Sequence, residues 1–349
     1  EEFKPDIIHV HHPFLLGDTA LRMAAVRNIP VVFTHHTQYD CYTHYVANDS
    51  AALRRFVVDL VIGYCNLCDA VIAPSESIAA ALIGSGVSTR IEVIPTGIDL
   101  QQFSRGDGAA FRAAFNIPAH AYLVGHVGRL APEKNLEFLA QAVATFLADR
   151  PDACFLVVGG GPSAEQIRHI FTRHGLSERL YLTGSVDGQQ LIDAYKAMDV
   201  FAFASLTETQ GLVLTEAMAA GVPVVALNAT GVREVVVDKH NGRLLQGGDA
   251  AQFAAALQWM AALPPAARLA MVSAAQHSAA AFAMPLCAAR ALALYESLLG
   301  GGHANRTSAT KLWTKTLHLI DEEWKIMTTK AKAAGAALRK SGTSSEISH

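Results

Sequence analysis

Short apolar runs alternate with segments of helical periodicity over the first 300 residues. In the first third, runs with the length and β-branched content of buried strands occupy residues 5–11, 30–34, 70–73 and 91–94. Further along, similar runs occupy residues 122–127, 154–158, 180–182, 199–204 and 222–226. Strands that alternate with helices at such short spacings predict a parallel, doubly wound α/β sheet.

A polar, glycine-bearing stretch at residues 104–108 divides this pattern into two series. A chain of 349 residues is long enough for two sizeable cores. We therefore predict two Rossmann-like domains that face a cleft, over residues 1–108 and 109–299. Sheets of this type bind ligands at the carboxyl ends of their strands, so the candidate chemistry is expected in the loops that follow the strands.

After Gly300 the pattern changes to a single apolar stripe, with steps of four and three residues from Trp313 to Leu338. This spacing predicts an amphipathic helical tail over residues 303–340. Lysine and arginine side chains flank the stripe. The stripe could lie on an anionic membrane surface, or it could pack on the body of the protein or on a second chain.

Composition narrows the class of protein. Apolar residues make up 51% and charged residues 17%, which is typical of a globular chain. A net charge of −3 argues against nucleic acid as a partner, because nucleic-acid binding requires a basic face. The five cysteines are too few for a disulfide framework and indicate a reducing compartment, so we expect a cytoplasmic location. Residues 269–289 are uncharged but polar enough to make a poor membrane span.

The segment from Glu208 to Glu216 carries the strongest chemical signal. It follows the buried run 199–204 and passes through Gly211 into a predicted helix that begins near Leu212. A helix N-terminus attracts phosphate through its free N–H groups and partial positive charge. A carboxylate can accept pairs of hydroxyl hydrogen bonds, so this spacing suits a sugar or ribose beside a phosphate. The alternative is two solvated surface glutamates.

A second cluster follows the run 122–127. Gly128 allows a close backbone approach, while Arg129 and Lys134 offer two cations at the end of a strand. Two cations beside a helix N-terminus can hold a diphosphate and stabilise its leaving charge without a metal. A glycine turn with solvated basic side chains is the alternative. The glycines at 159–161 follow another strand and are a weak signal alone.

Six histidines lie within the first 44 residues, namely His9, His11, His12, His35, His36 and His44. A metal site is possible, but no cysteine or aspartate spacing supports a closed one, so we predict none. Adjacent residues of an extended strand point to opposite faces. We therefore place His36 in the cleft and His35 in the packing.

The order of four motifs resembles family 4 of the retaining nucleotide-sugar glycosyltransferases, which have the GT-B fold. The motifs are the turn Thr96–Asp99, the Gly-Arg-Leu segment with Lys134, the glycines ending at Gly161, and two glutamates with seven residues between them. The resemblance covers residues 1 to about 298. It implies retention at the anomeric carbon, with the β-phosphate oxygen helping to deprotonate the acceptor, and neither a cofactor nor a metal.

The resemblance also assigns roles to residues. Arg129 and Lys134 would bind the donor diphosphate, Glu208 the sugar hydroxyls and Glu216 the ribose. His36 would lie beside the donor sugar, and with Glu208 it is the expected catalytic residue. Further donor contacts are expected at Gly128, Gly161, Gln210, Gly211 and Leu212, and acceptor-side contacts at Tyr39, Thr96, Gly97 and Asp99.

Two details narrow the expected substrates. Most of the family has Phe where this chain has Gln210, and Gln210 together with residues 34–45 looks like the diacylglycerol glucosyltransferase subgroup. That similarity implies UDP-glucose as donor, a membrane-lipid hydroxyl as acceptor, an α-glycoside product and peripheral contact with the inner face of a membrane. The alternatives are a soluble or polysaccharide acceptor, and a catalytically silent nucleotide-sugar-binding module.

One departure concerns the start of the chain. From the size of a Rossmann-like half, we expect the family's first domain to open with roughly 75–90 further residues. These would carry a first strand and a glycine loop that closes over the phosphates. They do not precede Glu1 in this sequence, so the expected first domain is incomplete at its N-terminus.

Overall fold

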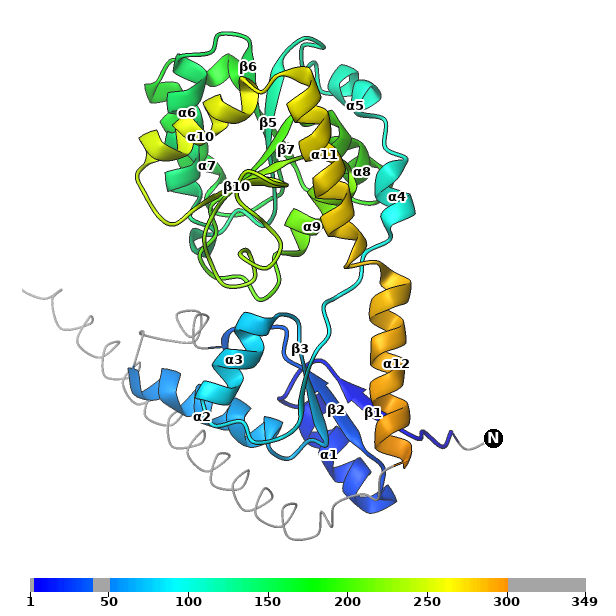
Figure 1. The fold of residues 1–349 in the computed structure, drawn as a ribbon. Coiled ribbons are helices and arrows are strands. Elements are labelled where there is room, and N and C mark those ends of the chain that lie inside the picture. The colour runs from blue at the N-terminus through cyan, green and yellow to red at the C-terminus, as the bar shows by residue number, and fades with distance from the viewer. Residues whose placement is uncertain (1–2, 40–50, 301–349) are drawn as a thin grey trace, which may run out of the picture.

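The computed structural model describes residues 3–39 and 51–300, which form two α/β bodies one above the other in Figure 1. The first domain is built on four parallel strands in the order β1-β2-β3-β4. Its strands are β1 (Ile8–Val10), β2 (Val31–Thr34), β3 (Ala70–Ala73) and β4 (Ile91–Val93). Its helices are α1 (Leu16–Arg27), α2 (Ala51–Cys65) and α3 (Glu76–Gly84).

Local sequence explains how these elements begin and end. α3 begins at Glu76 because the Ser75 hydroxyl accepts a hydrogen bond from the Ile78 amide at the helix N-terminus. α1 ends at Asn28, which adopts the left-handed conformation that asparagine tolerates. Every residue of β2 and β3 is buried, as expected for parallel strands covered on both faces.

The second domain contains a six-stranded parallel sheet in the order β10-β9-β8-β5-β6-β7. The strands are β5 (Tyr122–Val127), β6 (Ala153–Val158), β7 (Leu180–Gly184), β8 (Val200–Phe203), β9 (Val224–Leu227) and β10 (Gly242–Leu245). The helices are α4 (Leu100–Ser104), α5 (Gly108–Ala114), α6 (Leu136–Ala148), α7 (Ala164–Arg173), α8 (Gly188–Ala197), α9 (Leu212–Ala219), α10 (Ala250–Ala261) and α11 (Pro265–Ala280). Short 3-10 turns occur at η3 (Pro132–Lys134) and η4 (Ser177–Arg179). The prediction of two parallel α/β domains is confirmed.

Two hydrophobic clusters, one on each face of the second sheet, form the core of this domain. Leu123 on β5 belongs to the cluster beneath α8 and α9, while its neighbour Val124 belongs to the cluster beneath α6 and α10. Successive side chains of a strand point to opposite faces, so β5 contributes to both clusters. This rigid sheet ends on the side that faces the first domain, where the loops after β5, β6 and β8 carry the candidate site.

The last helix, α12 (Met284–Gly300), differs from the expected domain division. We expected it to belong to the second domain, but Figure 1 shows it beside the sheet of the first domain. Leu294 is buried there with Val32 and Ile72, which lie on β2 and β3. The Tyr295 hydroxyl lies 2.7 Å from Nδ1 of His9. α12, at the end of the described chain, thus covers one of the two buried faces of the first sheet.

Among the helices at residues 3–39 and 51–300, none is both long and apolar enough to cross a membrane. The predicted tail at 303–340 lies outside the described residues, as do His44 and residues 40–45 of the subgroup motif.

Candidate functional site

The loop after β5 brings backbone and cations to the edge of the sheet. Gly128 has a φ of 155°, and its amide donates to the carbonyl of Val158 at 3.0 Å. Arg129 forms an ion pair with Glu133, and its side chain is 53% exposed. The guanidinium is therefore accessible at the carboxyl edge of the sheet, where a diphosphate was expected.

The glycines of the β6 loop allow that loop to pack against the β5 loop. A Cβ at Gly159 would lie 1.9 Å from the Gly128 carbonyl oxygen, and one at Gly161 would lie 2.3 Å from the Leu130 carbonyl oxygen. Both glycines also have positive φ values. Gly161 was expected to contact the donor. In the structure Gly161 packs against the backbone of Leu130 in the β5 loop. The absence of a side chain at Gly161 lets that loop lie so close.

A salt bridge joins the two predicted motifs. Nζ of Lys134 lies 2.6 Å from Oε1 of Glu208, and the two side chains are only 17% and 14% exposed. The residues are 74 positions apart and come from the turn before α6 and the loop after β8. The structure therefore places a cation and a carboxylate together at the end of the sheet.

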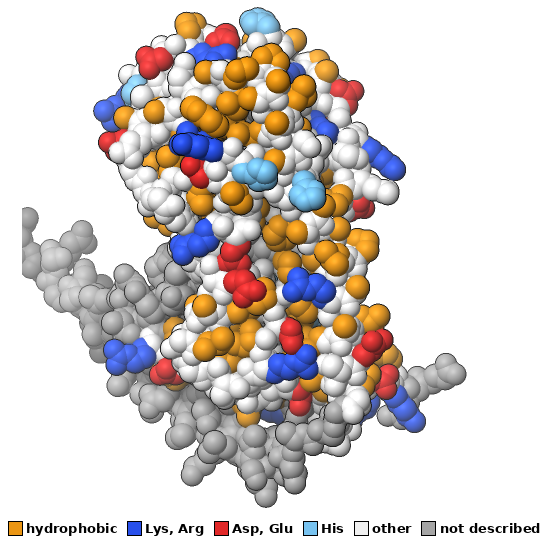
Figure 2. Space-filling model, in the orientation of Figure 1, with side chains coloured by type: hydrophobic (Ala, Val, Ile, Leu, Met, Phe, Trp, Pro, Cys, Tyr) orange, Lys and Arg blue, Asp and Glu red, His pale blue; other side chains and the backbone are white. Residues whose placement is uncertain are grey.

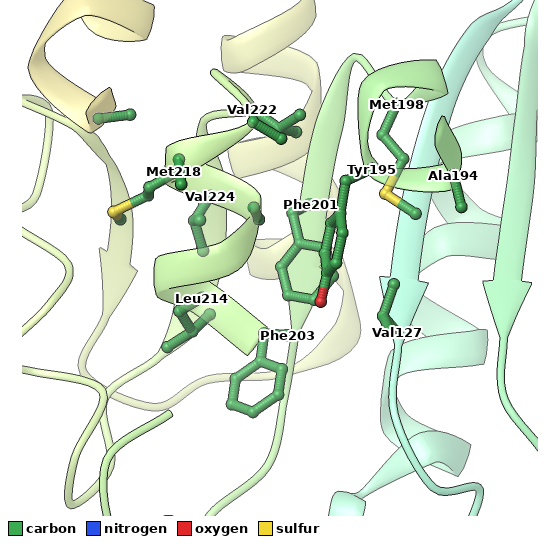
Figure 3. Close-up of a cluster of buried hydrophobic side chains, with 14 of the residues drawn as sticks. Val127, Ala194, Tyr195, Met198, Phe201, Phe203, Leu214, Met218, Val222 and Val224 are labelled. Atoms are coloured by element: carbon green, nitrogen blue, oxygen red, sulfur yellow. The ribbon is translucent and has the colours of Figure 1, made fainter. Parts of the chain in front are cut away.

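α9 begins directly after that loop. Gly211 has a φ of 69° at the N-cap position, which favours glycine, and Leu212 is the first helical residue. Glu216 lies in the second turn, where its Oε2 accepts a hydrogen bond from the Tyr195 hydroxyl at 2.7 Å. Figure 3 shows Tyr195 beside Phe201, to the right of the helix that carries Leu214 and Met218. Burial raises the pKa of Glu216 above its usual value, although the hydrogen bond from Tyr195 partly opposes this shift.

On the first-domain side, imidazole and phenol rings gather after β1 and β2. Nε2 of His36 lies 2.8 Å from Nδ1 of His11, and the rings stack at 5.0 Å. Burial, and then His11, lower the pKa of His36 below its usual value. Tyr39 packs edge-on against His35, which is buried as expected, and burial raises the pKa of Tyr39 to about 12.

The turn after β4, residues 96–99, was expected to line the cleft. In the structure it contacts Gln210, the start of α12 and the N-terminus of α4. The Gln210 side-chain amide donates to the Thr96 carbonyl at 2.9 Å and its oxygen accepts from the Thr96 amide at 2.7 Å. Gly97 packs so closely on the start of α12 that a Cβ would lie 2.6 Å from Cα of Met284. The Asp99 carboxylate caps α4. In the structure Gln210, predicted as a donor contact, joins the two domains.

Family models match most of the chain. The model described as "Glycosyltransferase Family 4" matches residues 1–102, and the one described as "Glycosyl transferases group 1" matches residues 108–278. A relative named D-inositol 3-phosphate glycosyltransferase, from Kribbella flavida, is 30% identical over 306 residues, covering 84% of this chain and 71% of the relative. The chain belongs to glycosyltransferase family 4.

Two further relatives of this family 4 chain are also longer than the chain itself. Alpha-monoglucosyldiacylglycerol synthase of Streptococcus pneumoniae is 31% identical over 252 residues, which are 71% of this chain and 57% of the relative. The namesake from Acholeplasma laidlawii is 29% identical, with 63% of its length covered. The chain thus spans about three fifths of these two relatives.

Solved structures support the GT-B arrangement. Anabaena Alr3699/HepE, in complex with UDP and glucose, has a TM-score of 0.69 at 25% identity, over 84% of this chain and 78% of that one. Sucrose-phosphate synthase from Thermosynechococcus elongatus has a TM-score of 0.71 at 26% identity, over 84% and 74%. The similarity spans both domains of this family 4 chain.

Several contacts between the domains were missed from the sequence. The Ser75 hydroxyl donates to the Thr209 carbonyl at 2.7 Å, in addition to capping α3. The Glu234 carboxylate accepts from the amides of Glu76 and Ser77 at 2.7 and 2.8 Å, so a side chain of the second domain caps a helix of the first. Only the N-cap signal of Ser75 was visible in the sequence, since partners more than 100 residues away leave no local pattern.

A cavity of about 430 Å³ lies at the same junction. Its lining includes His35, Gln38 and Tyr39 of the first domain, and Leu206 and Thr207 of the second. Where the two bodies meet, Figure 2 shows acidic and basic side chains close together, with apolar surface above and below them. Within residues 3–39 and 51–300, no three His, Cys, Asp or Glu side chains are placed to hold a metal ion.

Proposed function

We propose that this chain is part of a retaining glycosyltransferase that moves glucose from UDP-glucose to a lipid hydroxyl such as that of diacylglycerol, giving an α-glycoside. Membership of family 4 supports group transfer from a nucleotide sugar. A structural neighbour at 25% identity was solved with UDP and glucose, and another structure of it with UDP-glucose, which supports this donor.

The observation that carries the proposal is the Lys134–Glu208 salt bridge at the carboxyl edge of the second sheet. The pair lies beside Arg129 and the start of α9, so a diphosphate there would meet two cations and a helix N-terminus. Glu208 would then be free to accept hydrogen bonds from sugar hydroxyls. Glu216, already bonded to Tyr195, would accept hydrogen bonds from the ribose.

The proposed chemistry needs no metal and no cofactor. The bond between the anomeric carbon and the β-phosphate oxygen breaks, and the acceptor oxygen forms a new bond to that carbon on the same face. The acceptor proton passes to the departing β-phosphate oxygen, so the products are the α-glycoside and UDP. Arg129 and Lys134 stabilise the charge that develops on the diphosphate. Burial, and then His11, lower the pKa of His36, which favours its neutral form, and its side chain would lie beside the sugar.

Two acceptors are supported by relatives. The alpha-monoglucosyldiacylglycerol synthases, at 31% and 29% identity, favour a diacylglycerol acceptor. The D-inositol 3-phosphate glycosyltransferase of Kribbella flavida, which aligns over 71% of its own length, favours a soluble phosphorylated polyol instead. A lipid acceptor implies peripheral contact with the inner face of a cytoplasmic membrane. Salt-sensitive sedimentation with anionic vesicles would support that contact.

Calorimetric titration with UDP and UDP-glucose tests the donor site, with GDP-mannose as the control nucleotide sugar. We expect UDP and UDP-glucose to bind, and Glu216→Ala to weaken both. Binding of GDP-mannose in preference to UDP-glucose would contradict the proposed donor. If a folded protein, judged by its thermal melt, bound none of the three, the assignment of the site would be wrong.

Transfer to dioctanoylglycerol and to inositol 3-phosphate, measured with radiolabelled UDP-glucose, then separates the two acceptors. Proton NMR of the product reports the anomeric configuration, and a β-product would contradict retention.

A further inference from the structure

The junction cavity continues away from the candidate site, between two helices of the first domain. Its lining there is formed by apolar side chains of α2 and α3, among them Val58, Ile62, Ala81 and Leu82. Leu206 of the second domain also lines it and is 55% exposed in the structure. A cavity of this size that is lined mainly by apolar side chains, with a few polar groups at one end, is typical of sites that bind a small ligand.

One end of the cavity meets the residues assigned to the donor sugar. Thr207, which lines the cavity, precedes Glu208 in the chain. Gln38 also lines it, and its side-chain amide donates to the Glu208 backbone carbonyl at 3.4 Å. The bond from Ser75 to the Thr209 carbonyl holds the start of α3 beside the same loop. One end of the cavity therefore adjoins the loop that carries Glu208, where an acceptor hydroxyl would react.

We propose that the cavity between α2 and α3 holds an acyl chain of the acceptor lipid. This inference rests on the proposed function and extends it from the hydroxyl to the apolar part of the substrate. With its hydroxyl near Glu208, the lipid would place an ester-linked chain along Ile62 and Leu82, where an apolar occupant removes hydrophobic surface from water. A short phosphorylated polyol would have no part to fill this space.

Photo-crosslinking tests where the chain lies. The full-length protein would be labelled with a diacylglycerol that carries a diazirine at the end of one acyl chain, and the labelled peptides identified by mass spectrometry. We expect labelling on α2 and α3, reduced by excess unlabelled diacylglycerol. Labelling confined to other segments, including residues 301–349, would overturn the inference.

Two tryptophan substitutions on α3 give a matched pair. Ala81 is exposed and lines the cavity, whereas Ala80 is exposed and is not part of the lining. We expect Ala81→Trp to raise the KM for dioctanoylglycerol about tenfold or more, because the indole fills the space that the acyl chain needs. Ala80→Trp should leave this KM within about twofold of that of the unsubstituted protein. Hydrolysis of UDP-glucose without acceptor should stay unchanged in both.

The outcomes separate this inference from the proposed function. Crosslinking on α2 and α3 without glucosyl transfer to diacylglycerol would support the lipid site and contradict the proposed reaction. Transfer with equal KM values in the two tryptophan variants would support the reaction and contradict the site. A loss of UDP-glucose hydrolysis in Ala81→Trp would show that the cavity serves the donor, and would overturn the acyl-chain assignment.

Discussion

The two domains present different kinds of surface to their junction. On the second domain, loops from β5 and β6 pack backbone against backbone at glycines, and Lys134 and Glu208 hold each other in a mostly buried salt bridge. On the first domain, the rings of His35 and Tyr39 line a cavity of about 430 Å³, which Leu206 and Thr207 of the second domain border. The second-domain side of the junction is held in one geometry by its own contacts, whereas the first-domain side borders a cavity.

This difference matches the division of substrates among relatives. Two relatives are named for the synthesis of a monoglucosyldiacylglycerol and another as an inositol 3-phosphate glycosyltransferase, although all three are 29% to 31% identical to this chain. A preorganised site favours one ligand, since its geometry costs nothing to form at the moment of binding. A cavity lined by side chains can change its ligand by changing a few residues. We therefore expect donor contacts to tolerate less substitution than acceptor contacts.

The largest expected effect is on the salt bridge. Lys134→Ala or Glu208→Ala should lower kcat/KM for transfer by about 10²–10³-fold, because each removes a charged contact to the donor. Each variant should still unfold cooperatively, although its melting temperature should fall because the remaining charge is mostly buried and unpaired. The exposed pair of Glu165 and Arg168 offers a control, and Arg168→Ala should leave transfer unchanged. Full activity of either site variant in the complete enzyme would contradict the assignment.

The next effect tests whether the loops are fixed by glycine. Gly161→Ala should cost about 1–3 kcal/mol of unfolding free energy, since its Cβ would overlap the Leu130 carbonyl. Gly175→Ala is the matched control, because Gly175 also has positive φ but no atom within 4 Å of its would-be Cβ. Urea unfolding measures both. Equal losses of unfolding free energy in the two variants would mean that the positive φ, rather than the close contact between the loops, is what requires glycine at position 161.

A smaller, pH-dependent effect is expected at His126, in the core beneath the β5 loop. Burial lowers its pKa to about 4, while the unfolded chain takes up this proton near 6.5. Its contribution to stability is therefore complete above pH 6.5 and declines by about 1.4 kcal/mol per pH unit as pH falls towards 4. His126→Phe should flatten this slope in urea unfolding from pH 7 to pH 5. The exposed His120→Phe should not, and equal slopes in the two variants would refute the assignment.

The smallest expected effect concerns the contact between the domains. Gln210→Ala should cost about 1 kcal/mol, because both hydrogen bonds to Thr96 are lost, and should increase the radius of gyration in solution scattering. Gln189→Ala removes a surface hydrogen bond to Asp193 and serves as the control. If Gln210 also contacts the donor, the affinity for UDP-glucose will fall as well, whereas unchanged affinity would limit its role to joining the domains.

The sequence was most informative where structure depends on local pattern. The two series of parallel strands follow from the pattern of apolar runs, and the structure pairs Lys134 with Glu208 at the carboxyl edge of the second sheet. Partners distant in sequence could not be predicted. Glu234 capping α3 is one case, because the capped amides and the carboxylate come from different domains.

The helix α12 is another such case. Its spacing predicts a helix, yet the sheet it covers is set by packing of Leu294 against β2 and β3. The short edge strand β10 was also missed, since its four residues include Gly242 and Arg243 and are mostly half-buried. Such segments lack the continuous apolar run by which the central strands were recognised.

Within residues 51–300 the chain crosses between the domains twice, once before α4 and once before α12, and the two crossings are bonded to each other. The Ile98 amide donates to the Phe282 carbonyl at 2.8 Å, and the Met284 amide donates to the Ile98 carbonyl at 2.9 Å. Two linkers that are hydrogen-bonded to each other restrict the relative motion of the domains more than two separate linkers would. A torsional change at Gly97, which lies next to this pair, would therefore move the part of the junction far from the linkers more than the part close to them.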